Sequence, residues 1–190
     1  MKKILLFAAM AFVTVAASAQ TLKFGHVNFS ELVQLMPASD SARTQINAAQ
    51  KEAQDTYQSM VEEYQTKAEQ YKEKNSIWTP AVKKSKEDEL IDIQNRIQQF
   101  EQNIQQELQQ QQQQLMAPIQ KKAVDEVTKI AKAKGLIYVF DSSSVLYIDD
   151  KQSLDLTPEA RKALNIPASR TIESLQKELM EQQQAAQPKK

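Results

Sequence analysis

The stretch NSIWTP (residues 75–80) decides the fold, because it divides one long helical pattern into two halves. Its asparagine and serine favour a turn, and its proline suits the first position of a helix that the preceding threonine caps. On either side the chain continues without glycine, from Asp40 to Lys134. We therefore predict a helical hairpin over residues 40–134 with its tip at this stretch.

Apolar residues recur at steps of three and four on both sides of the tip, which predicts a coiled-coil-like seam. The outgoing positions are Ile46, Ala49, Ala53, Tyr57, Val61, Tyr64, Ala68 and Tyr71, and the returning positions are Leu90, Ile93, Ile97, Phe100, Ile104, Leu108, Leu115, Ile119, Ala123, Val127 and Ile130. Tyrosine and alanine make the outgoing half a weak seam that offers wettable aromatic contacts. At 1.5 Å per residue the arm would be on the order of 50 Å long.

Two features of the returning half need interpretation. Glutamine fills 12 of the 21 positions from Gln94 to Gln114, which a prion-like tract also does. Glutamine is a good helix former, and here it occupies the outer faces around an intact apolar stripe, so we favour a plain helix. Pro118 lacks an amide proton and should kink this helix, which predicts a bend between arm and body.

The chain before the arm predicts a strand and a short helix over residues 20–39. Leu22 to Val27 has strand character, and Asn28 with Glu31 matches a capping box at a helix start. The helix should stop at Pro37, and the arm should begin at Ser39 or Asp40.

The chain after the arm predicts a strand pair and another short helix over residues 135–166. Gly135 ends the arm, and Leu136–Phe140 and Val145–Ile148 read as strands around a polar turn. A short helix follows at 156–164, with Thr157 as its cap. Residues 167–190 would form an amphipathic helical extension with Ile172, Leu175 and Leu179, followed by a disordered tail.

The first 19 residues predict an export signal. Lys2 and Lys3 precede the apolar run Ile4–Val15, and the small residues that follow indicate cleavage after Ala19. The run is too short for a membrane anchor, which needs about 20 residues. The sequence contains no cysteine, so neither lipid attachment after the signal nor a disulfide is available. We expect a soluble extracytoplasmic protein.

Charge and composition exclude several function classes. Loss of Lys2 and Lys3 from 24 basic residues, against 24 acidic ones, leaves a mature chain of about −2 with interleaved charges, which argues against nucleic acid as a partner. The single histidine, His26, has no cysteine or other ligand at metal-binding spacing and is interpreted as a structural or surface histidine. Ser142–Ser144 lacks a nucleophile-elbow context, and no phosphate-binding loop occurs. We expect no enzyme, no metal and no cofactor.

A thin hairpin cannot bury a large core, so the residues themselves predict an oligomer. In this order and spacing, several local features resemble the Skp (OmpH-like) family of periplasmic chaperones: the strand ending at Val27, the hairpin, Tyr138–Asp141, Tyr147 and Asp155–Thr157. The resemblance implies an α+β fold in which a long helical arm stands on a small β-rich oligomerisation body, assembled as a jellyfish-like trimer. The candidates for the core of the body and trimer are Phe24, Val27, Leu136, Tyr138, Val139, Phe140 and Tyr147.

The same resemblance implies an ATP-independent holdase that encloses unfolded outer-membrane β-barrel proteins between its arms. Arm aromatics and tip residues are the client-contact candidates, namely Tyr57, Tyr64, Tyr71, Ile77 and Trp78. For Trp78, packing across the hairpin end is an equal alternative. The near-neutral charge departs from the basic members of the family and argues against contact with membrane or lipopolysaccharide. The alternative function is a structural coiled-coil scaffold of the cell envelope.

Overall fold

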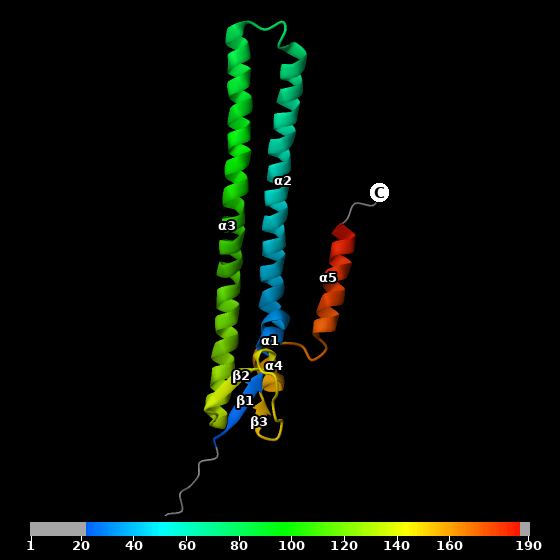
Figure 1. Cartoon of the computed structure of the whole chain (residues 1–190). Coiled ribbons are helices and arrows are strands. Elements are labelled where there is room, and N and C mark those ends of the chain that lie inside the picture. The colour runs from blue at the N-terminus through cyan, green and yellow to red at the C-terminus, as the bar shows by residue number, and fades with distance from the viewer. Residues whose placement is uncertain (1–21, 187–190) are drawn as a thin grey trace, which may run out of the picture.

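The protein has a long two-helix arm on a small mixed base (Figure 1), and its computed structural model describes residues 22–186. The arm pairs α2 (Pro37–Lys74) with the antiparallel α3 (Pro80–Lys134). The base contains three short strands and two short helices, and a fifth helix follows. The predicted α+β class with a helical hairpin is confirmed. The predicted signal with its cleavage site, and the last four residues of the tail, lie outside the described residues.

The ends of the arm helices follow from local capping. The hydroxyl of Thr79 accepts a hydrogen bond from the amide of Val82 at 3.4 Å, and Pro80 takes the first helical position as predicted. Gly135 ends α3 with a φ of 66°, the left-handed conformation that glycine adopts without strain. α2 begins at Pro37, two residues before the predicted start, because proline fits the first turn of a helix.

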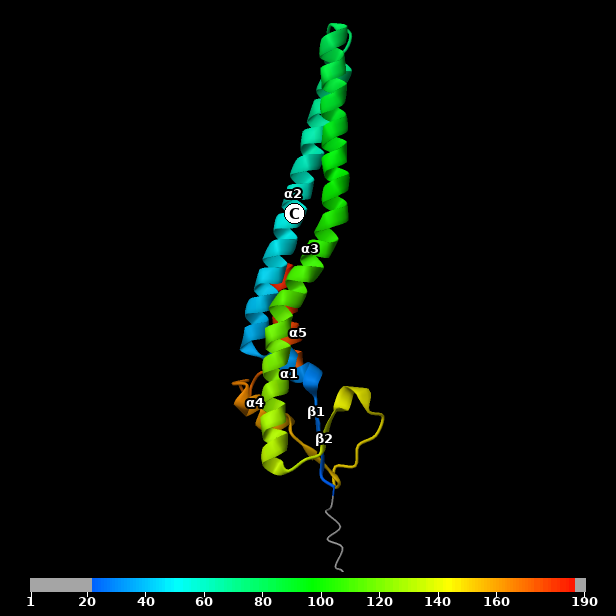
Figure 2. The same cartoon turned by 90° about the vertical axis from the view of Figure 1, so that its left-hand side faces the viewer.

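α3 runs through Pro118 as one helix of 55 residues. Figure 2 shows that this helix is bent, with its upper part turned away from the line of its lower part. A proline in the interior removes one backbone hydrogen bond and crowds the preceding turn, which accounts for a bend without a break.

The sheet is parallel and has the first strand at its centre. β1 (Phe24–Val27) lies between β2 (Tyr138–Asp141) and β3 (Ser153–Asp155), and Phe24 is opposite both Tyr138 and Ser153. The prediction that strand 136–140 pairs with strand 145–148 is therefore wrong. Residues 145–148 form no strand, and a short 3-10 turn, η1 (Ser142–Ser144), precedes them.

The pairing has a physical reason that local propensity cannot reveal. β1 offers both of its edges, so the two later strands pair with it and not with each other. Asp141 turns the chain at the end of β2, because its carboxylate accepts a hydrogen bond from the amide of Ser143 at 3.1 Å. The same carboxylate accepts one from the amide of Phe29 at 3.3 Å, which ties β2 to the start of the first helix.

The capping of α1 (Phe29–Leu35) is as predicted, and that of α4 (Thr157–Ala163) is not. The side-chain oxygen of Asn28 accepts from the amide of Glu31 at 3.0 Å, and its side-chain nitrogen donates to the Glu31 carboxylate at 3.2 Å. The hydroxyl of Thr157 accepts from the amide of Asn28 at 3.0 Å, so it serves the start of α1 and does not cap its own helix. The prediction for Thr157 is corrected.

The core lies where the lower part of α3 meets the base. α3 contributes a stripe at steps of three and four, and α1 packs against it with α4 and the segments that flank α4. α5 (Ile172–Ala186) adds Leu175, which is 3 % exposed. The buried members of this core are Val27, Leu32, Val33, Leu35, Met36, Ala42, Ile119, Ala123, Val127, Ile130, Leu156, Ala160, Leu164, Ile166 and Leu175.

A side chain at Gly25 would disrupt this base. A Cβ there would lie 2.7 Å from Leu136 Cδ1 and 3.2 Å from the carbonyl oxygen of Leu154. We predict that Gly25→Ala lowers the free energy of unfolding by about 1–3 kcal/mol, the range for overpacking, measured by urea denaturation. Gly135→Asn is the control, because asparagine tolerates the left-handed backbone and nothing lies within 4 Å of a Cβ there. Unchanged stability of the alanine variant would contradict this packing.

Candidate functional site

The three arm tyrosines lie seven residues apart on α2 and form ties to α3. Tyr71 donates a hydrogen bond to the Glu87 carboxylate at 2.6 Å, and the Tyr64 hydroxyl accepts one from Gln94 at 2.9 Å. A hydrogen bond to the Glu101 carboxylate raises the pKa of Tyr57. Their partners on α3, Glu87, Gln94 and Glu101, are also seven residues apart. The three pairs therefore follow a single antiparallel register of the two helices.

The hydrogen bonds of the tyrosines are thus used within the arm, while part of each ring remains accessible. Tyr57 is exposed, and Tyr64 and Tyr71 are half-buried. A tyrosine in such a position stabilises the helix pair and still offers an apolar ring edge to another molecule. Client contact by these rings stays a prediction.

The tip places its two large apolar residues differently. Trp78 packs edge-on against Tyr71, with ring centroids 5.8 Å apart, and is half-buried. Ile77 is 79 % exposed. The packing alternative for Trp78 therefore accounts for one side of its ring. Ile77 is the more accessible of the two candidates.

An ion network closes the upper arm. Glu63 lies 3.1 Å from Arg96 across the two helices, and Lys67 on α2 pairs with Glu89 on α3. Glu89 also receives Lys86 at 2.8 Å. Hydrogen bonds from Lys67, and then from Lys86, lower the pKa of Glu89 from 4.5 to about 2. Lys67, Lys84 and Lys86 near the tip are thus each paired with a carboxylate.

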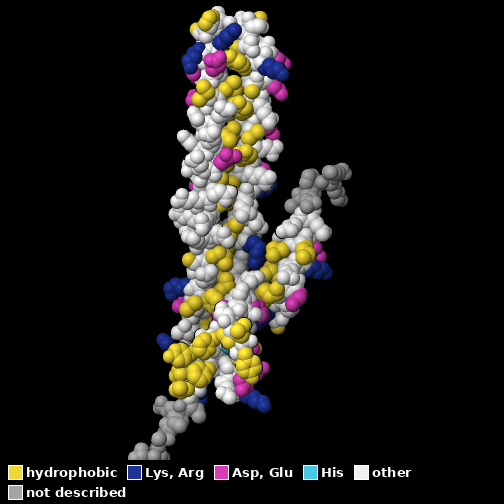
Figure 3. Space-filling model, viewed as in Figure 1, with side chains coloured by type: hydrophobic (Ala, Val, Ile, Leu, Met, Phe, Trp, Pro, Cys, Tyr) yellow, Lys and Arg dark blue, Asp and Glu magenta, His cyan; other side chains and the backbone are white. Residues whose placement is uncertain are grey.

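The middle of the arm is open by comparison. Between the buried Ile93 and Ile119, the seam positions of α3 stay half exposed, among them Phe100, Ile104 and Leu108. Two hollows flank this section, with volumes of about 610 and 520 Å³, and Leu108 lines both. Their other walls are mainly amide and apolar side chains, and Figure 3 shows few charged side chains at this level.

The base carries an aromatic face on the outer side of the sheet. The rings of Phe24 and Tyr138 stack at 6.4 Å with an interplanar angle of 7°, and Phe140 lies 6.1 Å from Tyr138. Tyr138 is 61 % exposed and Tyr147 is 79 % exposed. Figure 3 shows hydrophobic side chains gathered over this end of the molecule. We call Phe24, Tyr138 and Phe140 the aromatic face, and Tyr147 lies in the irregular segment that follows η1.

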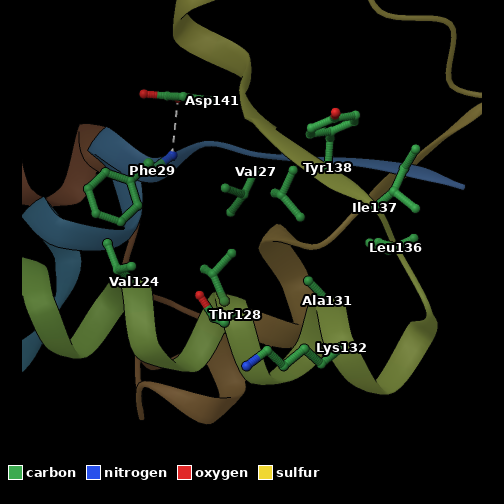
Figure 4. Close-up of a pocket in the computed structure, with 12 residues that line it drawn as sticks. Val27, Phe29, Val124, Thr128, Ala131, Lys132, Leu136, Ile137, Tyr138 and Asp141 are labelled. Atoms are coloured by element: carbon green, nitrogen blue, oxygen red, sulfur yellow. Dashed lines mark hydrogen bonds between the residues drawn. The ribbon is translucent and has the colours of Figure 1, made fainter.

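A groove of about 500 Å³ lies between β2 and the lower part of α3 (Figure 4). Val124 and Thr128 point from the helix toward the sheet, and Val27 points back toward the helix, whereas the ring of Tyr138 points away from it. Leu136 and Val139, two of the predicted core residues, are half-buried along this groove. Among the seven candidates for the body core, Val27 reaches full burial within one chain.

A comparison with protein-family models shows to which family the chain belongs. A model of the family described as "Outer membrane protein (OmpH-like)" matches residues 23–164, which include the strands, the whole arm and α4. The chain belongs to the OmpH-like family. No curated protein matches the sequence. Among solved structures six chains match, and one of them is described as an OmpH-like outer membrane chaperone from Caulobacter crescentus, with 12 % identity over 76 % of this chain and 84 % of that one and a TM-score of 0.67. The likeness shows a shared fold, and the family supports a chaperone role.

The sequence did not predict three apolar side chains that are exposed on the base and the lower part of α3. Leu146 is fully exposed, and Ile137 and Val124 are about half exposed beside the groove. The apolar run that contains Leu146 was the only signal, and its β propensity led to a strand prediction. His26 is buried and bonds Ser153 at 2.9 Å, which agrees with a structural role.

Neither a metal site nor a membrane span is found in the OmpH-like chain over residues 22–186. No group of three or more potential metal ligands occurs there. None of the helices in the same range has both the length and the apolar character needed to cross a bilayer.

The pKa of Glu89 tests the ion network of the upper arm. Because its pKa is lowered in the folded protein, the pairing stabilises the arm fully above pH 4.5, and this contribution is lost as the pH falls through about 2. We predict that Lys67→Gln raises the Glu89 pKa toward 4.5, measured by carbon-13 NMR titration of the carboxyl group. Lys51→Gln, which removes an exposed pair with Asp55 on α2, should leave it unchanged. A Glu89 pKa near 4.5 in the parent would contradict the network.

Proposed function

We propose that the protein is an ATP-independent periplasmic holdase that keeps unfolded outer-membrane proteins from aggregating between the helical arms of a trimer. The observation that carries this proposal is the open middle of the arm. It presents half-exposed apolar side chains of α3 over a long surface without forming a closed pocket. That surface suits a flexible chain and does not suit a small molecule.

The physical task explains why many weak contacts are sufficient. An unfolded barrel exposes alternating apolar strands, which pair with those of another copy and aggregate. Contacts along several arms add through their effective concentration, while each contact remains quick to release. This action requires separation of clients and no bond chemistry, so we propose no catalytic residue.

The aromatic face and the groove support oligomerisation through the base. Monomeric proteins rarely leave a contiguous apolar patch of several aromatic rings uncovered. The short edge strands β2 and β3 also keep one side each free of a sheet neighbour within the described chain. Together with the resemblance to the OmpH-like family, these features support a trimer in which the base of each chain covers part of the base of the next chain.

The trimer interface can be tested at Tyr147. Tyr147→Asp would place a carboxylate in a covered apolar surface, which costs about 1–3 kcal/mol and should raise the dissociation constant about five- to 150-fold. Ile77→Asp is the matched control, because Ile77 has the same exposure of 79 % but lies at the tip. Sedimentation velocity reads out the oligomer. A Tyr147 variant that assembles like the parent would contradict this interface.

The holdase itself is tested with a denatured outer-membrane barrel diluted from urea, with aggregation followed by light scattering. We predict suppression by the parent protein. Changing Tyr57, Tyr64 and Tyr71 to Ala should weaken suppression several-fold, and changing them to Phe should retain most of it, because the rings remain. Circular dichroism controls for loss of the arm helices.

One result would contradict the holdase, and another would contradict only the role of the tyrosine rings. Aggregation that a well-folded oligomer leaves unaltered would favour an envelope scaffold with one fixed native partner. Suppression that is unchanged by the alanine variant would exclude the tyrosine rings as client contacts, while leaving the holdase in place.

A further inference from the structure

The root of the arm has an interruption or a weak point on each of its two helices. On the outgoing side, Met36 separates α1 from α2 with an extended backbone, at φ −61° and ψ 136°. On the returning side, Pro118 precedes Ile119, which shares a core cluster with Ala42 near the start of α2. A helix break and an interior proline are both places where helices change direction. The angle between arm and base is therefore not fixed by continuous, fully bonded helices.

The segment after α4 fastens both sides of this root. Arg161 on α4 donates to the Glu31 carboxylate on α1 at 2.5 Å, below the break. Arg170 donates to the Asp40 carboxylate in the first turn of α2 at 2.6 Å, above the break. Arg161 also donates to the backbone carbonyl of Arg170, which links the two contacts directly.

The same segment is itself anchored. Leu164 and Ile166 are buried, and Asn165 turns the chain with a φ of 56°. α5 then packs Leu175 into the core cluster, with Ile172 partly buried beside it. Figure 1 shows α5 beside the base of α2, pointing in the same general direction as the arm. The contacts of Arg170 therefore come from an ordered, packed element and not from a loose tail.

Arg170 is the centre of the arrangement. Its side chain is only 20 % exposed, lies 3.6 Å from Glu178 on α5 and holds Asp40 on α2. Its Nε is buried and has no hydrogen-bond partner within residues 22–186. The carboxylates of Asp40 and Glu178 hold this guanidinium in place. The planar set of N–H donors of an arginine suits two carboxylates better than the ammonium group of a lysine does.

We propose that residues 165–186 form a brace that sets the angle of the arm on the base, with Arg170 as its positioning residue. The family match ends at residue 164, so the brace lies beyond the matched range. The consequence for the client rests on the proposed function: a fixed arm angle sets the width of the space between arms.

The test measures the arm angle in the full mature protein without any client. Because the sequence has no cysteine, nitroxides can be placed on Ser76→Cys at the tip and Lys162→Cys on α4. Doubly labelled chains are refolded with excess unlabelled chains, so that pulsed EPR reports distances within one chain. Hydrogen exchange of the amides in residues 36–44 provides a second readout.

We expect Arg170→Ala to broaden the distance distribution and to speed exchange in residues 36–44 about fivefold, the change expected for loss of an ion pair worth about 1 kcal/mol. Arg170→Lys should retain the contact with Asp40 and most of the narrow distribution. Lys177→Ala is the control, because this exposed residue lies on α5 and pairs only with Glu181.

The brace is overturned if Arg170→Ala and a chain that ends at Pro167 both keep the parent's distance distribution and exchange rates. A shorter chain that changes both readouts, beside an unchanged Arg170→Ala, would assign the brace to the packing of α5 and overturn the role of Arg170. Failure of the holdase assay with altered distances would remove the proposed function and leave the brace standing.

Discussion

The structure depends on the packing of the lower part of α3 against the base. A pair of helices in water buries too little surface to be stable alone. Here the α2 residues that face α3 are at most half-buried beyond Ala42. The stripe of Ile119, Ala123, Val127 and Ile130 inserts one of these helices into the core, where α1 and α4 cover it. Everything above this stripe is carried by it. The arm can therefore keep its middle open without losing its place on the base.

The tyrosine hydrogen bonds and the ion pairs of the upper arm add to this packing of α3 against the base. Tyrosine hydroxyls and the Glu89 network tie the helices by polar contacts at their surface, while the section below them is more weakly closed. Polar contacts between the two helices are thus concentrated in the upper arm, and buried apolar contacts at the base. A surface that has to receive different unfolded segments benefits from such a section, because half-exposed apolar side chains can adapt to their partner.

Much of the fold follows from local chemistry, and the failures have one cause. The tip, the Asn28 cap, the Thr79 cap and the end at Gly135 were predictable, because each depends on residues within a single turn. The strand pairing was not, because β1 meets its partners across more than a hundred residues, and local β propensity does not specify which strands pair.

The candidate site shows the same limit. Which α3 residue each tyrosine meets depends on the register of the hairpin, so the sequence could identify Tyr57, Tyr64 and Tyr71 but not their partners. The brace depends on Arg161 and Arg170 meeting carboxylates about 130 residues away. The sequence predicted the helix after residue 167, but it contained no signal that this helix holds the root of the arm.

The central claim is that unfolded clients are enclosed by several arms, and the mass of the complex tests it most directly. The mature protein is mixed with a denatured outer-membrane barrel during dilution from urea, and the soluble complex is weighed by native mass spectrometry. We predict three chains with one client, and we expect hydrogen exchange to show that the client is unprotected. A complex with a folded partner in fixed register, or a folded oligomer that retains no client, would contradict it.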